Sequence, residues 1–155
     1  MEVEDVTLDK KRSLRAEALV GRAFEYLTLV NAYANHYDKN TAATDPGVPL
    51  MLDKEINKSN LERATVQQVY DQILIDLDTA ALYSPSKQKT AYRASKPVGL
   101  GMLARMYLYM GEYNEALKYA KLSLAENSSL LDLKNYSVVD PDKSIGRINV
   151  PYGAD

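Results

Sequence analysis

The residues that could support acid–base or metal chemistry are few, and they form no constellation. His36 is the only histidine of the chain, and a catalytic or metal-binding histidine needs partner ligands at suitable spacing. Asp71, Asp76 and Asp78 follow one another in steps of five and two residues, which places them on different faces of a helix and indicates a solvated surface. The sequence contains no cysteine, which excludes thiolate zinc sites and cysteine nucleophiles. The sequence therefore predicts no catalytic residue, no metal site and no cofactor, and favours a protein that is not an enzyme.

Two further patterns resemble fragments of catalytic or phosphate-binding motifs. Ser84 and Ser86 flank a proline but lack a glycine-flanked nucleophile turn, so this segment is typical of a simple turn. Gly99 and Gly101 make half of a phosphate-binding loop, yet no strand is expected before them and no lysine follows. Close packing between helices is the better interpretation of these two glycines.

Tyrosine is the residue type that indicates binding. The chain has 12 tyrosines and no tryptophan, and a tyrosine presents a flat apolar face with a polar tip, which suits both sugars and protein interfaces. These side chains are scattered over different helices and links, so the sequence predicts that the isolated chain binds neither glycans nor peptides with useful affinity. The candidate partner or ligand contacts are Tyr33, His36, Tyr37, Tyr92 and Tyr109.

Composition limits the function further. The net charge is −2 and no run of Lys or Arg exceeds three residues, so the chain lacks the basic face of a nucleic-acid-binding domain. No stretch approaches the roughly 20 apolar residues of a membrane helix. The charged N-terminus has no apolar core, so no signal peptide is predicted. A length of 155 residues suits one domain.

The positions that could bind a partner must be held by helices. Apolar residues in steps of four and three predict a first helix over 14–37, with Ser13 as its N-cap. Thr65 and Gln68 form a capping box in which each side chain reaches a backbone donor of the other. A second helix is therefore predicted over 65–83.

Two more helices follow and are joined by a short link. The third is predicted over 96–110, with Pro97 in its first turn, and the fourth over 112–126. Gly111 stands between them as a C-terminal glycine. So short a link makes the two helices antiparallel neighbours.

The chain divides around these helices. We expect a polar N-terminal segment over 1–13, a helical repeat domain over 14–136 and an irregular tail over 137–155. Within the domain, 38–63 is a long insertion loop with prolines and a glycine, irregular but ordered because 48–52 is apolar.

The third and fourth helices match the tetratricopeptide pattern. Ala104 and Ala116 are small enough for the helices to approach closely, and Gly111 supplies the turn. The first two helices are a degenerate copy, offset by 81 residues in the first helix and by 43 in the second, so the insertion accounts for 38 residues. The predicted fold is all-α, with two tetratricopeptide-like antiparallel hairpins and a long insertion in the first. Two repeats leave an apolar strip uncovered, which we expect to include Leu29, Leu108 or Leu122 and to promote self-association.

Several segments, in this order, resemble the SusD/RagB family over about residues 14–136. They are 15–19 (RAEAL), 22–26 (RAFEY), 47–50 (GVPL), 63–66 (RATV), 76–77 (DL), 103–108 (LARMYL) and 111–113 (GEY).

The resemblance implies a nutrient-binding lipoprotein of the outer membrane at the cell surface. Such a protein captures glycans or other nutrients without catalysis and covers a TonB-dependent transporter. The family's lipidated N-terminal cysteine has no counterpart in this sequence, so membrane attachment is expected only through a lipid anchor that this chain lacks. By the same resemblance, the chain is expected to be the helical scaffold that faces the transporter. The alternative is a generic tetratricopeptide adaptor for protein–protein interaction.

Overall fold

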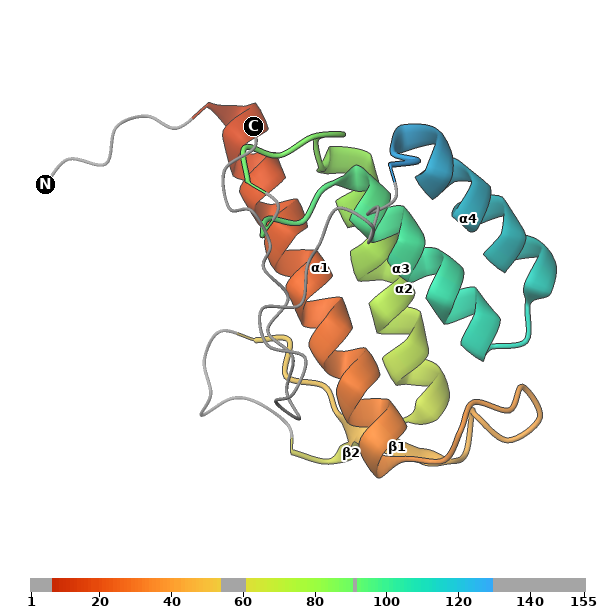
Figure 1. Cartoon of the computed structure of the whole chain (residues 1–155). Helices are drawn as coiled ribbons and strands as arrows, with labels where there is room; N and C mark the ends of the chain where they lie inside the picture. The colour runs from red at the N-terminus through yellow and green to blue at the C-terminus, as the bar shows by residue number, and fades with distance from the viewer. Residues whose placement is uncertain (1–6, 54–60, 91, 130–155) are drawn as a thin grey trace, which may run out of the picture.

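Four helices and a small two-stranded sheet make up the computed structural model, which describes residues 7–53, 61–90 and 92–129 (Figure 1). The expected tail over 137–155 lies outside the described residues. In chain order the elements are α1 (Leu8–Tyr33), β1 (Pro46–Pro49), β2 (Arg63–Thr65), α2 (Val66–Tyr83), α3 (Lys96–Tyr109) and α4 (Tyr113–Glu126).

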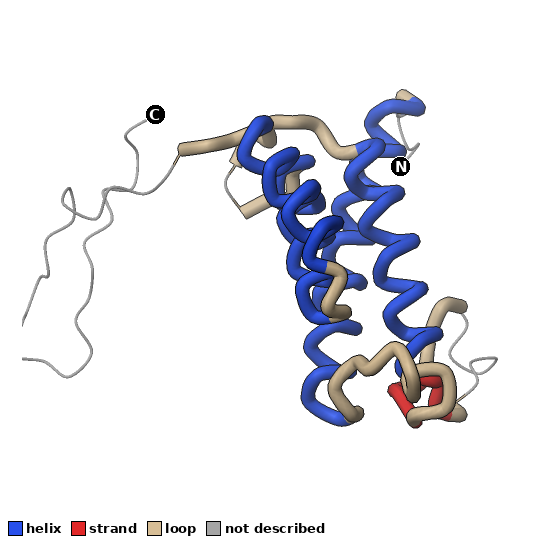
Figure 2. The backbone as a smooth tube through the Cα atoms, turned by 90° about the vertical axis from the view of Figure 1, so that its right-hand side faces the viewer, coloured by secondary structure: helices blue, strands red, loops and turns tan. Residues whose placement is uncertain are grey.

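The helices form two antiparallel hairpins, which confirms the all-α, tetratricopeptide-like fold. The hairpin of α1 and α2 packs through α2 against α3, and α4 lies on the far side of α3 (Figures 1 and 2). The core is continuous across three helices, so the two hairpins are one body. Its fully buried large side chains include Val30, Val66, Val69, Tyr70, Ile73, Leu77, Leu103 and Met106.

The prediction for the ends of α1 is wrong at both sides. The helix begins at Leu8 instead of Leu14, because the Thr7 hydroxyl, not Ser13, accepts a hydrogen bond from the Lys10 amide (3.4 Å). It ends at Tyr33 rather than Tyr37, because Ala34 adopts an extended backbone conformation. His36 and Tyr37 therefore belong to a connecting segment.

The capping box of α2 is confirmed. The Thr65 hydroxyl accepts from the Gln68 amide (3.2 Å), and the Gln68 side chain accepts from the Thr65 amide (2.9 Å). Two of the otherwise unpaired donors at the start of the helix are thus satisfied.

Replacing Thr65 with alanine is expected to lower the free energy of unfolding by about 1 kcal/mol, because the Gln68 amide loses its acceptor. Urea unfolding measures the change. Thr28→Ala is the matched control, since this exposed hydroxyl only donates to the carbonyl of Phe24 within the helix. An equal loss of stability in both variants would contradict the capping role.

The insertion is more regular than predicted, because its two ends pair. β1 and β2 are antiparallel, with an irregular register between Pro46 and Pro49. Arg63 fixes the pair, since its guanidinium donates to the carbonyls of Gly47 (2.6 Å) and Tyr33 (2.8 Å). Ala42 and Val48 are buried in the core, so the described part of the insertion is ordered as expected.

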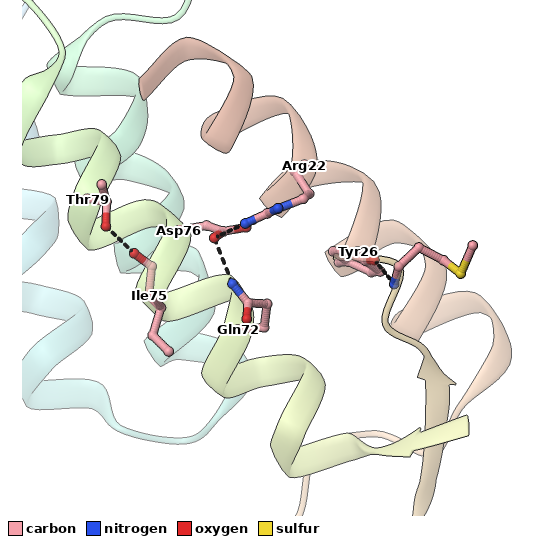
Figure 3. A network of polar contacts seen from close by, with 7 residues as sticks. Arg22, Tyr26, Gln72, Ile75, Asp76 and Thr79 are labelled. Carbon is pink, nitrogen blue, oxygen red and sulfur yellow. Dashed lines mark hydrogen bonds and ion pairs between the residues drawn. The ribbon is translucent and has the colours of Figure 1, made fainter. Parts of the chain in front are cut away.

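A side-chain network ties α1 to α2 (Figure 3). The Arg22 guanidinium donates two hydrogen bonds to the Asp76 carboxylate (2.6 and 2.7 Å), and Gln72 donates a third (2.8 Å). The expectation of a solvated Asp76 is wrong, because these partners allow its carboxylate to be buried at 2% exposure. In the same view, the Tyr26 hydroxyl accepts from the Met51 amide (2.6 Å) and anchors the insertion to α1.

Candidate functional site

The end of the bundle near the C-terminus of α1 carries an open hollow of about 500 Å³. One wall is the segment that follows α1, and the other is the turn between α3 and α4. Gly111 makes this turn possible, because its φ of +76° lies in the left-handed region that glycine adopts without strain. The lining residues are His36, Tyr37, Asp38, Lys39, Asn40, Met110, Gly111 and Glu112.

Tyr37 is held firmly on the inner side of the hollow. Its ring lies against the buried ring of Tyr70, with centroids 4.8 Å apart. Its hydroxyl donates to the Gln67 side chain (2.8 Å), which in turn donates to Asp71 (2.7 Å). Burial raises the pKa of Tyr37, and it raises the pKa of Tyr70 to about 12, so both phenols stay neutral at physiological pH.

The remaining walls are polar and partly aromatic. His36 is exposed and contacts the half-buried ring of Tyr109 in an edge-to-face arrangement, with centroids 6.4 Å apart. Asp38 accepts two hydrogen bonds from Asn40 at Oδ1, one from its amide and one from its side chain (both 2.9 Å). Glu112 is exposed at the rim. The hollow thus combines aromatic rings with two carboxylates.

The structure brings together three of the five sequence-predicted contacts. His36 and Tyr37 line the hollow, and Tyr109 contacts His36 from α3. Tyr33 is 70% exposed and does not line the hollow, and Tyr92 is 81% exposed on the link between α2 and α3. The prediction that the candidate contacts are scattered is therefore wrong for His36, Tyr37 and Tyr109, which lie together.

Sequence reasoning missed Asp38, Asn40 and Glu112. The signal for Asp38 and Asn40 was their position directly after the two candidates His36 and Tyr37. No signal marked Glu112, because it meets the segment after α1 only through the packing of the hairpins.

The groups around the hollow can bind a polar ligand. Within residues 7–53, 61–90 and 92–129, no group of three or more His, Asp or Glu side chains is placed to hold a metal ion. The hollow has aromatic side chains and convergent polar groups, which small-ligand sites use to orient a ligand, and its lining is more polar than in most such sites.

A second hollow of about 330 Å³ runs between α3 and α4 and is almost entirely apolar. Small residues form its floor and large exposed ones its rim, with Leu108 53% and Leu117 55% exposed. Leu29 and Leu122 are also exposed, as expected for the uncovered strip. The lining residues are Ala104, Arg105, Leu108, Tyr113, Ala116, Leu117 and Ala120.

Comparison with known proteins identifies the family. The family model described as SusD-like, starch-binding and associating with the outer membrane matches residues 1–108. The chain belongs to the SusD-like family. The resemblance found in the sequence is thereby confirmed. A comparison with curated protein sequences gives no match.

Solved structures of SusD-like proteins share this fold. A SusD-like carbohydrate binding protein from Bacteroides vulgatus is 26% identical, with a TM-score of 0.73 over 85% of this chain and 28% of that one. A SusD superfamily protein from the same species is 25% identical, with a TM-score of 0.74 over 84% and 30% of the two chains. A SusD superfamily protein from Bacteroides thetaiotaomicron is 22% identical, with a TM-score of 0.75 over 86% of this chain and 29% of that one. The chain thus spans less than a third of the length of these SusD-like proteins.

The SusD-like family associates with the outer membrane. In the part of this member that the structure describes, no helix has both the length and the apolar character needed to cross a bilayer.

Proposed function

We propose that this chain is the helical part of a nutrient-uptake protein that binds glycans at the cell surface and does not transform them. The observation that carries the proposal is the SusD-like match over residues 1–108, together with the similarity to a carbohydrate-binding protein of known structure. The hollow at the end of α1 supports it, because aromatic rings on one wall and carboxylates on both walls suit a polyhydroxylated ligand.

In this proposal, the helical hairpins face a TonB-dependent transporter, and a lipid anchor outside this sequence holds the protein at the outer membrane. Large exposed apolar side chains on α3 and α4 support a protein partner, since contiguous exposed apolar surface marks interaction sites. Leu108, Tyr113 and Leu117 are exposed and line one apolar hollow, and Leu122 and Leu124 are also exposed on α4.

A tetratricopeptide adaptor remains the second candidate, and the apolar hollow between α3 and α4 favours it. The insertion counts against it, because a peptide adaptor does not need one in its first hairpin. Here Arg63 and Gly47 build the ends of the insertion into the fold. The uptake function is therefore the better supported of the two.

The full-length protein isolated from its native outer membranes tests the proposal. We expect it to retain neutral oligosaccharides, to release them chemically intact, and to co-purify with a protein whose sequence is that of a TonB-dependent transporter. Absence of glycan binding would overturn the nutrient-binding function, and cleaved oligosaccharides would show an enzyme. Glycan binding without a transporter would overturn the assignment of the partner alone.

A further inference from the structure

The hollow at the end of α1 has the features of a ligand site within this chain. We infer that it is a subsite for one neutral pyranose ring of a glycan, an inference that rests on the proposed glycan-binding function. It replaces the expectation from the sequence that the isolated chain binds no glycan, because that expectation took the candidate contacts to be scattered, and His36, Tyr37 and Tyr109 lie together. A volume of about 500 Å³ falls within the range of about 300–1,000 Å³ that is usual for small-ligand sites.

Aromatic rings on one side of the hollow provide an apolar surface for the sugar. The C–H bonds on one face of a pyranose carry partial positive charge and pack against the negative face of an aromatic ring. His36 is exposed at this wall, and the edge-to-face contact with Tyr109 limits how its ring can turn. Tyr37 adds a second ring just inside.

Acceptors for the sugar hydroxyls stand on both walls. The hydrogen bonds from Asn40 both end on Oδ1 of Asp38, and among the described residues none donates to Oδ2. Glu112 faces the hollow from the turn between α3 and α4. Its side chain forms no hydrogen bond or ion pair with any residue that the structure describes. Carboxylates accept strong hydrogen bonds from hydroxyl groups.

Charge selects the class of sugar. Asp38 and Glu112 face the hollow. Asp71 lies close enough to Tyr37 for its negative charge to help raise the pKa of that phenol. Lys39 is the one cation whose charge is fixed among the lining residues. The excess of negative charge disfavours uronic acids and sulfated sugars and leaves neutral sugars as the ligands that fit.

The walls are also fixed before a ligand arrives. Tyr37 is held by Tyr70 and Gln67, and Asp38 is held by Asn40. Side chains that are already ordered lose little conformational entropy on binding, which raises the affinity of a small site.

The test titrates the 155-residue chain with maltohexaose, laminarihexaose and an oligogalacturonate, using calorimetry and amide chemical shifts. At least one neutral oligosaccharide is expected to bind and to shift the amides of residues 36–40 and 110–112. His36→Ala and Glu112→Ala are each expected to weaken binding at least about fivefold, as the loss of one contact of about 1 kcal/mol predicts. Phe24→Ala and Glu25→Ala, exposed positions on α1 outside the hollow, are expected to leave binding unchanged. Thermal melts establish that each variant is folded.

The outcomes separate this inference from the function on which it rests. Neutral glycan binding that both hollow variants retain, or shifts that map elsewhere, would overturn the subsite but leave the proposed function intact. Glycan binding by the full-length protein and not by this chain would also overturn the subsite and leave the proposed function intact. If the oligogalacturonate binds more strongly than the neutral oligosaccharides, the assignment of neutral sugars as the ligands is wrong. If neither the chain nor the full-length protein binds any glycan, the proposed function fails as well.

Discussion

Replacing Arg22 with alanine is expected to lower the free energy of unfolding by about 3 kcal/mol. The substitution leaves the Asp76 carboxylate buried at 2% exposure with Gln72 as its remaining partner. Removing one partner of a buried ion pair is strongly destabilising, because the other charge stays uncompensated. Arg22 itself is 35% exposed, which keeps the expected value at the lower end of the usual range. Urea unfolding followed by circular dichroism measures the effect.

Two controls make this experiment specific to burial. Glu115→Ala removes an ion pair with Lys118 in which both side chains are well exposed, and such pairs contribute about 0–1 kcal/mol. The double variant Arg22→Met/Asp76→Leu removes both charges and is expected to recover most of the lost stability. If Arg22→Ala costs no more than Glu115→Ala, the pair does not hold α1 against α2.

Replacing Gly47 with alanine is expected to lower the free energy of unfolding by about 2–3 kcal/mol, a typical cost of overpacking. A Cβ at this position would lie 2.8 Å from the Ala64 carbonyl oxygen and 2.9 Å from the carbonyl carbon and oxygen of Thr65. These are backbone atoms of β2, so no flexible side chain can move aside. The two strands must separate, and the hydrogen bond from Arg63 to the Gly47 carbonyl is then lost.

Gly21→Ala is the matched control for this prediction. A Cβ there meets nothing within 4 Å, and Gly21 lies exposed within α1. Alanine in a helix is more stable than glycine by about 0.5–1 kcal/mol, so this variant is expected to unfold at a higher urea concentration than the parent. Equal stability of the two variants would show that β1 and β2 tolerate separation.

Helix periodicity and the capping of α2 were readable from the sequence because they depend on residues close together in the chain, whereas the N-cap of α1 was placed at Ser13 instead of Thr7. Thr65 and Gln68 are three residues apart, and the start of α2 is confirmed. The end of α1 was not readable, because the Tyr33 carbonyl accepts a hydrogen bond from Arg63, which lies 30 residues later in the chain. The pairing of β1 with β2 was missed because four and three residues are too few to show an alternating pattern.

The candidate site shows the same limit. Residue type alone singled out His36, Tyr37 and Tyr109, because aromatic side chains outside the core are good contacts. The hollow lined by His36 and Tyr37, and the contact of Tyr109 with His36, depend on how the end of α3 packs beside the segment after α1, which no local pattern encodes. The burial of Asp76 was mispredicted for a related reason, since its partner Arg22 lies 54 residues earlier.

The pairing of β1 with β2 also makes the first hairpin tolerant of changes in length. Pro49 lies opposite Arg63, so the segment between these two residues begins and ends at one place in the fold. Closing a longer loop there costs little, about 0.6 kcal/mol for each doubling of its length. Residues added between β1 and β2, after the Met51 amide that donates to Tyr26, are therefore expected to leave the spacing of α1 and α2 unchanged. A tag or a reporter domain inserted there is expected to leave the helical hairpins folded.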